Sequence, residues 1–564
     1  MDIFKFIIKT IGQFIFVIIF FSTLHAKNVD KFNDMDRVSD YFLGILLLNN
    51  NQYNESFRFL KKLDGLESSH VNYSTKYLYS LINSGNFNEA FNYSKKLEKR
   101  KLDNFESNLI SGIFYLKNSN FDQAKKYFLK AKNINSEFVL NNYVSNSLYN
   151  LSNLENLNLD SSIIEIKKLD KRFENLKKIQ SVFLNCFFNS PNTTNLFDQL
   201  TLNNKVDFSR YSYFYASYLA SSGKINEAKN VVQSALKLHP RNLLLNQYKI
   251  DLNQSRNIEK FNCRKEEHIV AEILYVTANA LSSQSVYTVS NFYLNLAKYL
   301  NKDFHSFDAL LAENFYKIDD YKKAKKIYIN LGNRGVAFKW YSTKQLARIF
   351  VQEEKKNDAI KLVKNSFKDL ANKDIYEIFD FAEFLKNNDN FQDSIPHYTK
   401  IIDNIKKSHP LYSEAMDGRG VAYEKIGEWD KAEKDLLASL EANPKQAYVI
   451  NYLAYSWIEK GVKIEKSLSM LEEANKLKTN DPFIIDSLGW ALFKLERYKE
   501  SKDYLQLAVR LMPGDPIVND HYGDVLWKNG KEIQARYYWQ YVLNLEKAEK
   551  DLKKTVEKKL IKGL

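Results

Sequence analysis

Hydrophobic and polar residues follow a helical period along almost the whole chain, in segments separated by polar or glycine-containing breaks. Ser222-Gly223-Lys224 and Ile426-Gly427-Glu428 are two such breaks. A small residue recurs within these segments at Gly44, Gly112, Ala216, Ala278, Ala312, Ala347, Ala382, Gly420, Ala454, Gly489 and Gly523, with Leu78 as a poor substitute. From Ala278 onward the steps are 34, 35, 35, 38, 34, 35 and 34 residues, which predicts an array of helical repeats.

Each unit also repeats one internal order of small and large residues, counted from this small site. Twelve positions later a second small residue stands at Ser56, Ala124, Ala228, Ala324, Ala359, Ser394, Ala432, Ser501 and Ala535. Sixteen positions later a large apolar residue stands at Leu60, Phe128, Tyr328, Tyr398, Leu436, Leu505 and Trp539. Two antiparallel helices need this order, because small residues let the axes approach and large residues fill the flanking space.

In these positions the chain resembles the tetratricopeptide repeat family. The clearest unit is Gly420-Val421-Ala422-Tyr423, followed by Ala432, Leu436 and Pro444. The resemblance implies an all-α fold, a right-handed superhelical solenoid of about 11–14 helix hairpins. It leaves the function open, because members of this family bind very different partners.

Length and register divide the chain into seven parts. They are 1–26 (signal peptide), 27–136 (N-terminal repeats), 137–205 (degenerate helical repeats), 206–268 (a repeat plus an inserted helix pair), 269–400 (central repeats), 401–545 (well-formed C-terminal repeats) and 546–564 (C-terminal helix or tail). Residues 241–268 add about one helix pair to the regular array. We place a boundary between two solenoid lobes near 205–265.

The N-terminus has the layout of a secretory signal peptide. Lys5 and Lys9 precede an apolar run from Ile11 to Phe21, and small or polar residues lead to a cleavage point after Ala26. Leu24 is larger than usual at the third residue before the cut, so an uncleaved membrane anchor is the alternative. No cysteine is close enough to carry a lipid. We expect an exported protein, periplasmic in a Gram-negative bacterium.

Charge and cysteine content add little to this picture. The formal net charge is +14, but lysines lie beside Glu and Asp along the polar faces of successive helices. This spread indicates a solvated basic surface and no nucleic-acid partner. Cys186 and Cys263 are about two repeats apart, so we expect their Cα atoms to lie beyond the ~7 Å limit of a disulfide, as two unpaired thiols.

No catalytic or metal-binding motif is present in the sequence. The eight histidines occur singly, without HExxH or paired CxxC spacing, and GxSxG and GxxxxGK[ST] are absent. Glu266-Glu267-His268, and His521 beside Asp520 and Asp524, are the acid and base neighbours worth naming. We interpret both as ordinary helix-surface residues and expect no enzyme, no metal and no cofactor.

A partner is expected on one stripe of the first helix of each unit, at −6, −3, +1 and +4 from the small site. In the last three units the candidate residues are Tyr448, Asn451, Tyr455, Phe483, Asp486, Trp490, Phe493, Asp520, Asp524 and Trp527, with Ile458 and Ile517 completing the stripe. Aromatic rings and carboxylates favour a segment that carries Lys or Arg. Two alternatives stay open: the rings pack against the next repeat, and the aspartates are caps or solvated.

Residues 410–545, including IIDSLGWALFKLERYKES, resemble a narrower group of bacterial envelope tetratricopeptide proteins. That group includes an outer-membrane lipoprotein adaptor of a periplasmic carboxy-terminal-processing protease, although the lipidated cysteine is missing here. The hypothesis is a non-catalytic envelope scaffold or adaptor that recruits protein or peptide clients through its concave groove, to a protease or an assembly machine. Binding of peptidoglycan or another polysaccharide is the alternative, and peripheral or N-terminal membrane association stays open.

Overall fold

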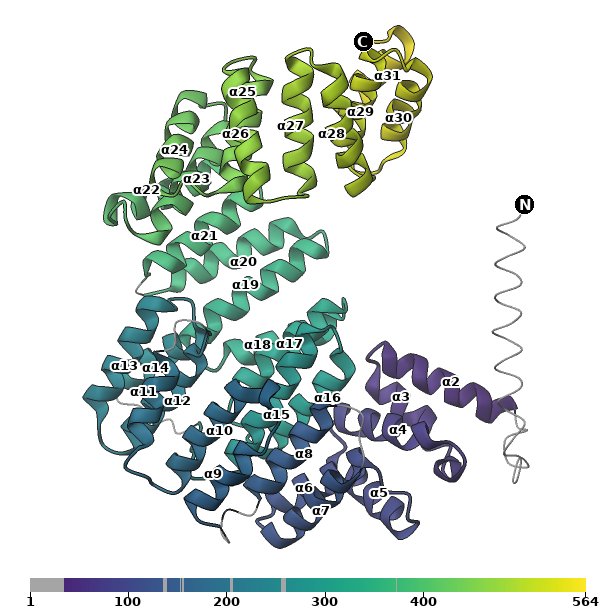
Figure 1. Cartoon of the computed structure of the whole chain (residues 1–564), viewed down its shortest axis with the longest axis vertical. Helices are drawn as coiled ribbons and strands as arrows, with labels where there is room; N and C mark the ends of the chain where they lie inside the picture. The colour runs from purple at the N-terminus through teal and green to yellow at the C-terminus, as the bar shows by residue number, and fades with distance from the viewer. Residues whose placement is uncertain are drawn as a thin grey trace. The chain divides into compact units, whose positions relative to one another are not determined.

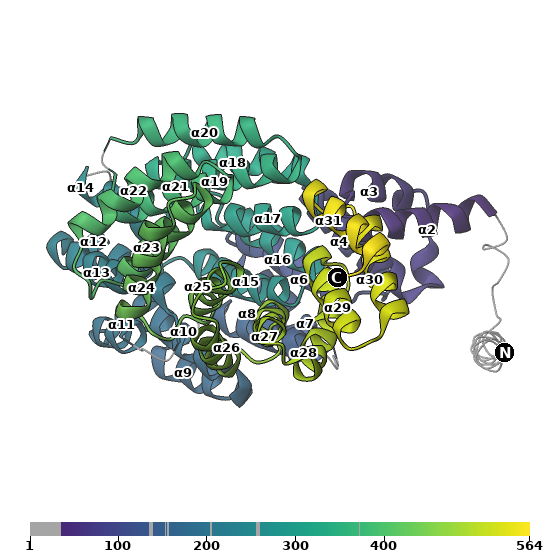
Figure 2. The same ribbon diagram turned by 90° about the horizontal axis from the view of Figure 1, so that it is seen from above.

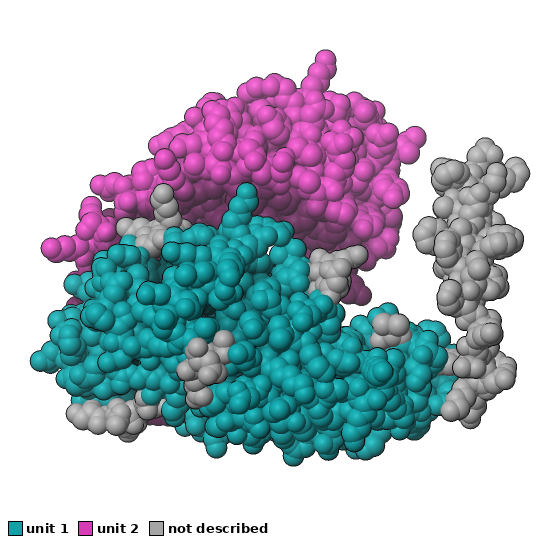
Figure 3. All heavy atoms as spheres, turned by 60° about the horizontal axis from the view of Figure 1, so that its bottom comes forward, with its two compact units in different colours: residues 1–355 teal, residues 356–564 magenta. Residues whose placement is uncertain are grey.

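A computed structural model describes residues 35–134, 139–152, 154, 157–202, 206–254, 260–371 and 373–564. These residues form α-helices joined by short turns, and no strand is found among them (Figure 1). They gather into two compact units, residues 1–355 (unit 1) and 356–564 (unit 2) (Figure 3). The predicted signal peptide, 1–26, lies outside the described residues. None of the described helices has the length and apolar character needed to cross a membrane.

Unit 1 contains the helices up to α19. Their bounds are α2 Met35–Asn49, α3 Tyr53–Lys61, α4 Val71–Asn83, α5 Phe87–Lys99, α6 Phe105–Lys117, α7 Phe121–Asn133, α8 Val139–Leu151, α9 Leu159–Lys167, α10 Glu174–Phe187, α11 Thr193–Thr201, α12 Ser209–Ser221, α13 Ile225–Leu238, α14 Leu243–Asn253, α15 Glu266–Ser283, α16 Tyr287–Leu300, α17 Ser306–Lys317, α18 Tyr321–Gly332 and α19 Val336–Gln352. The described residues also include the short 3₁₀ helices Leu66–Ser68 and Lys171–Phe173.

Unit 2 contains the remaining helices, which follow one another in hairpins. Their bounds are α20 Lys356–Asp369, α21 Ile375–Asn387, α22 Phe391–Asn404, α23 Pro410–Lys425, α24 Trp429–Ala442, α25 Ala447–Glu459, α26 Ile464–Leu477, α27 Pro482–Lys494, α28 Tyr498–Leu511, α29 Pro516–Lys528, α30 Glu532–Asn544 and α31 Lys550–Lys562.

The small sites lie where the two helices of a hairpin touch, which confirms the predicted helical solenoid. A Cβ atom added to Gly523 would lie 2.5 Å from Nε1 of Trp539, and one added to Gly489 would lie 2.7 Å from Cγ of Leu505. In both cases the obstructing residue is the large one sixteen positions later. Twelve positions after Gly489, the Ser501 hydroxyl donates to the Gly489 carbonyl oxygen at 2.7 Å. The recurring order of residues therefore sets the helix crossing.

Unit 1 folds back on its own N-terminal repeats. Helix α16 packs against α4 and α6, and α15 packs against α8, as both Figure 1 and Figure 2 show. The Tyr79 ring on α4, one position after the small site Leu78, meets Phe292 of α16 edge-on with centroids 4.9 Å apart. The Asn83 amide donates to the Thr288 carbonyl at 3.0 Å, and Asn291 donates to the Tyr53 hydroxyl at 2.8 Å. The stripe expected to face a partner is thus covered here by the chain itself.

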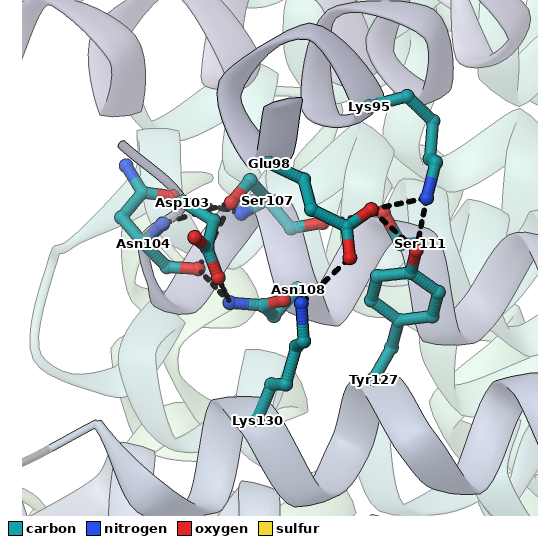
Figure 4. Close-up of polar contacts among 9 residues, drawn as sticks. All are labelled: Lys95, Glu98, Asp103, Asn104, Ser107, Asn108, Ser111, Tyr127 and Lys130. Atoms are coloured by element: carbon teal, nitrogen blue, oxygen red, sulfur yellow. Dashed lines mark hydrogen bonds and ion pairs between the residues drawn. The ribbon is translucent and has the colours of Figure 1, made fainter. Parts of the chain in front are cut away.

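Polar bonds also join neighbouring repeats of unit 1 (Figure 4). The Glu98 carboxylate on α5 accepts hydrogen bonds from Lys130 Nζ and the Tyr127 hydroxyl of α7, both at 2.6 Å, and from Lys95. Burial acts to raise the pKa of Glu98, but the bonds from Lys130, Lys95 and Tyr127 outweigh it and hold the pKa at about 2. These bonds fix the second helices of two successive repeats to each other.

Cys186 and Cys263 form a disulfide, with Cα atoms 5.9 Å apart, so the expectation of two unpaired thiols is wrong. That expectation assumed that a repeat contacts only its neighbours. Here Phe261 packs on Phe183 of α10 and Phe214 of α12, with ring centroids 5.4 and 4.2 Å apart. This aromatic cluster holds the segment before α15 against the end of α10 and brings the sulfurs together.

Two further differences arise from the same region. Between α13 and α15 the described residues form one helix, α14, where the sequence suggests an inserted helix pair. The division between the compact units falls at Lys355 and Lys356, and the expected boundary near 205–265 lies inside unit 1. The reason is that α14 packs against α19 and α15 against α8, so this segment is bound into the interior of unit 1.

Removal of the disulfide by a Cys186→Ala, Cys263→Ala double substitution is expected to destabilise unit 1. The bridge closes a loop of 77 residues, which in the chain-entropy model stabilises by about 4 kcal/mol. Hydrogen exchange in α10 and α15 should therefore quicken, while exchange in α25–α30 stays unchanged. Unchanged exchange in α10 and α15 would show that the aromatic cluster holds this segment without the bridge.

Candidate functional site

The first helices of the hairpins in unit 2 form one layer. Helix α25 packs against α27, and α27 packs against α29, while the second helices lie behind them. We define the inner stripe as the sixteen positions at −6, −3, +1 and +4 from Gly420, Ala454, Gly489 and Gly523. These are Glu414, Asp417, Val421, Glu424, Tyr448, Asn451, Tyr455, Ile458, Phe483, Asp486, Trp490, Phe493, Ile517, Asp520, Asp524 and Trp527.

The inner stripe is acidic and aromatic. It holds six carboxylates and six aromatic rings and no Lys or Arg. Unit 2 as a whole is balanced, since residues 356–564 contain 34 Lys and Arg and 34 Asp and Glu. No Lys or Arg therefore stands at a stripe position, although Lys478, Lys494 and Arg536 lie over the rings of Tyr448, Trp490 and Trp527.

The excess positive charge belongs entirely to unit 1. Residues 1–355 contain 48 Lys and Arg against 34 Asp and Glu, which gives the full +14. The expectation of an even spread is therefore wrong at the level of the two units. Unit 1 therefore carries the net positive charge of the chain, whereas unit 2 is neutral overall.

Three apolar side chains of the inner stripe are open to solvent. Tyr448, Phe483 and Ile517 are 53%, 54% and 49% exposed and occupy the same −6 position in three successive repeats. We call them the apolar row. Their helices α25, α27 and α29 are neighbours, so the row crosses three repeats on one face. An apolar row with this spacing is suited to contact with another protein segment.

The last repeat of the stripe is covered by the chain itself. Lys559 of α31 donates to both oxygens of Asp520 at 2.8 Å and to both oxygens of Asp524 at 2.7 Å. The Trp539 indole donates to Asp524 at 3.0 Å. Burial and the neighbouring Asp520 raise the pKa of Asp524 to about 6, even with Lys559 in place. These two aspartates are buried and paired, and are neither helix caps nor solvated.

In the preceding repeat, His521 is the partner of the stripe carboxylate Asp486. Its Nδ1 lies 3.0 Å from Asp486, and its ring stacks on Trp490 with centroids 3.9 Å apart. Burial acts to lower the pKa of His521, but the charge and hydrogen bond of Asp486 outweigh it and raise the pKa. Trp490 also stacks on Phe493 at 4.7 Å and donates to Glu459 at 2.7 Å. The interpretation of His521 as a surface residue is wrong, because the ring is buried between repeats.

Asp417 is a carboxylate of the stripe that forms no ion pair with another described residue. It stands three positions before Gly420, at the same offset as Asp486 and Asp520. Among the described residues its carboxylate has no hydrogen-bond or ion-pair partner. Burial is the main cause that raises its pKa to about 6; the charge of Lys386, the next largest effect, lowers the pKa, and the charges of Glu383 and Glu414 raise it. A cation from outside would stabilise the ionised form.

The matches to known families agree with this architecture. Residues 294–548 match a family model described as tetratricopeptide repeat, and residues 105–138 match a second model with the same description. The chain contains tetratricopeptide repeats. Tetratricopeptide repeat proteins generally mediate protein–protein interactions and are typically non-catalytic scaffolds.

Individual relatives resemble only parts of these tetratricopeptide repeats. A TPR repeat-containing protein of Pseudomonas aeruginosa is 28% identical over 125 residues, 22% of this chain, and the chain spans only 20% of that curated relative. MamA from Desulfovibrio magneticus RS-1 is 15% identical, over 32% of this chain and 99% of that one, with a TM-score of 0.28. A tetratricopeptide repeat protein from Parabacteroides merdae is 16% identical, over 39% and 85% of the two chains, with a TM-score of 0.32.

The candidate residues thus fall into three groups by exposure. Tyr448 and Phe483 are exposed to solvent. Four candidates are buried against other parts of the chain: Asp486, Trp490, Asp520 and Asp524. Asn451, Tyr455, Phe493 and Trp527 are partly buried. Asp417 and Lys559 were not among the predicted residues. The recurrence of Asp at −3 could have identified Asp417, whereas Lys559 has no repeat signal.

The structure also bears on metal binding and on the second acid–base neighbourhood. In the described part of the chain, no three His, Cys, Asp or Glu side chains gather as metal ligands would. His268 lies in unit 1, where its Nδ1 accepts the Asn262 backbone N–H at 3.0 Å. Burial, with smaller effects of Lys265 and Lys117, lowers the pKa of His268 to about 4, so this ring is neutral at pH 7.

Asp417→Asn is expected to stabilise unit 2 at pH 7.5. A carboxyl whose pKa is raised from 3.8 to about 6 favours the fold below pH 3.8, and that contribution is lost as the pH rises through 6. The gain in unfolding free energy should be about 1–3 kcal/mol at pH 7.5 and close to zero at pH 4. Urea unfolding followed by tryptophan fluorescence measures it, since five of the six tryptophans lie in unit 2.

The matched control is Asp503→Asn, because that carboxylate is exposed beside Lys502 and off the stripe. It should change the unfolding free energy by less than about 0.5 kcal/mol at either pH. A loss of stability in Asp417→Asn at pH 7.5 would mean that the carboxylate is already compensated within the fold.

Proposed function

We propose that this protein is a non-catalytic adaptor that holds Lys- or Arg-bearing segments of client proteins on the inner stripe of unit 2. The observation that carries this proposal is the composition of the stripe, six carboxylates and six aromatic rings with no basic residue, beside an exposed apolar row. The tetratricopeptide repeats give the general role in protein–protein interaction. The composition of the stripe indicates which residues the client segment carries.

The two kinds of group do different work in binding. Covering half-exposed Tyr448, Phe483 and Ile517 contributes on the order of 1–2 kcal/mol each from apolar burial. Asp417 and Glu414 favour a cationic side chain of the client, because the two negative charges repel each other and a cation between them would reduce that repulsion. A client segment therefore combines apolar anchors with Lys or Arg, and an acidic segment is rejected.

Our proposal places this adaptor in the cell envelope. The N-terminal arrangement of Lys5, Lys9 and the apolar run to Phe21 is that of an export signal. The disulfide between Cys186 and Cys263 supports the same assignment, because such bonds persist in oxidising compartments. The resemblance of residues 410–545 to envelope adaptors suggests delivery of clients to a protease or an assembly machine.

The test uses the full chain and three labelled peptides of about 20 residues. The first places Leu and Lys at helical spacing, the second replaces each Lys by Gln, and the third replaces each Lys by Glu. We expect fluorescence anisotropy to show binding of the Lys peptide, at least tenfold weaker binding of the Gln peptide and none of the Glu peptide. Raising the salt from 50 to 300 mM should weaken the binding of the Lys peptide most, because salt screens the attraction between its lysines and the carboxylates.

Substitution of the apolar row locates the binding surface. A Tyr448→Ser, Phe483→Ser double variant should bind the Lys peptide at least tenfold more weakly. Ile533→Ser is the matched control, because Ile533 is 88% exposed on α30, a second helix away from the stripe, and its loss should have no effect. Equal binding of all three peptides, or an equal effect of Ile533→Ser, would refute the proposal.

Saccharide binding is the second candidate, because the exposed rings of Tyr448 and Phe483 also suit stacking on sugars. Sedimentation with purified peptidoglycan separates the two candidates. A saccharide role requires co-sedimentation that Tyr448→Ser and Phe483→Ser remove and that Asp417→Asn leaves unchanged.

A further inference from the structure

The C-terminal helix α31 covers the end of the inner stripe. Helix α31 packs on α30, and its Lys559 reaches Asp520 and Asp524 of α29. The indole of Trp527, the last residue of the stripe, lies against the backbone at Gly563, where an added Cβ atom would be 2.1 Å from Cζ2. The Arg536 guanidinium donates to the Leu560 carbonyl at 3.3 Å. The chain thus displays one bound occupant of its own stripe.

Little besides these contacts holds α31. Val556 is its one fully buried residue, whereas α29 buries most of its length. Leu552 and Leu560 are partly buried against the same core, and Ile561 is 80% exposed. Since apolar burial is small, the double ion pair of Lys559 with two buried carboxylates is the main specific contact between α31 and the stripe.

We infer that α31 is an intramolecular occupant of a lysine-binding subsite, and that a client helix occupies the same subsite by displacing it. The subsite is formed by Asp520, Asp524 and Trp527. Its ligand is a helix with an apolar residue three positions before a lysine and a small residue four positions after it, as in Val556, Lys559 and Gly563. This inference rests on the proposed function for the client and adds the register in which the client binds.

A client helix has an advantage that α31 lacks. Helix α31 leaves Ile517 of the same repeat 49% exposed, and Phe483 and Tyr448 beyond it are exposed as well. A longer helix would pair its lysine with Asp520 and Asp524 and also cover the apolar row. The short connection Leu545–Glu549 keeps α31 at a high effective concentration, so a client that meets only the lysine subsite competes poorly.

The test uses the full chain and a labelled peptide of residues 546–564, which is α31 with its connection. Lys559→Gln removes the cation from the intramolecular helix, and Lys562→Gln is the matched control, because Lys562 is exposed on the same helix. Lys559→Arg keeps the charge. Hydrogen exchange over residues 550–562 and anisotropy of the peptide are the two readouts.

In Lys559→Gln, exchange over 550–562 should quicken at least tenfold, and the peptide should bind at least tenfold more tightly than it does to the unaltered chain. Lys562→Gln and Lys559→Arg should resemble the unaltered chain in both readouts. Unchanged exchange in Lys559→Gln overturns the inference, and so does an opened α31 to which the peptide does not bind. If the Lys559→Gln test fails while the Leu and Lys peptide still binds the unaltered chain, only the lysine subsite is refuted. If the Leu and Lys peptide does not bind the unaltered chain, the proposed function is refuted.

Discussion

The structure depends on how closely two helices can approach at one small residue. At Gly112, Gly489 and Gly523 there is no room for a Cβ atom, because Phe128, Leu505 and Trp539 occupy that space. The large residue comes from the second helix of the same hairpin, so the crossing is set by residues sixteen positions apart. Hairpins with the same crossing stack on one another, and stacking places their first helices side by side in one layer.

That layer is used in opposite ways by the two units. In unit 1 the first helices α4, α6 and α8 are covered by α15 and α16, and Tyr79 meets Phe292 in place of a partner. In unit 2 the corresponding stripe is open along the apolar row. His521 and Lys559 pair with its carboxylates in the last two repeats, whereas Asp417 has no ion-pair partner among the described residues. This difference is why we propose the client site on unit 2.

Much of the fold could be predicted from the sequence, because the small and large residues act locally. The positions of the hairpin contacts in the regular repeats follow from the spacing of Gly489, Leu505 and their equivalents. The disulfide could not be predicted, because it depends on contacts of Phe261 with helices about 50 to 80 residues away in sequence. The same holds for the candidate site. Asp520 and Asp524 look available in the stripe, and only Lys559 on the distant α31 shows that they are occupied.

The most direct test of the helix crossing compares two glycines of unit 2. Gly523→Ala should lower the free energy of unfolding by about 1–3 kcal/mol, since the indole of Trp539 must move. Gly514→Ala, with no atom within 4 Å of the added Cβ, should change it by less than about 0.5 kcal/mol. Urea unfolding by tryptophan fluorescence measures both. A Gly523→Ala variant that gains the ~1 kcal/mol of alanine's helix propensity would contradict the account.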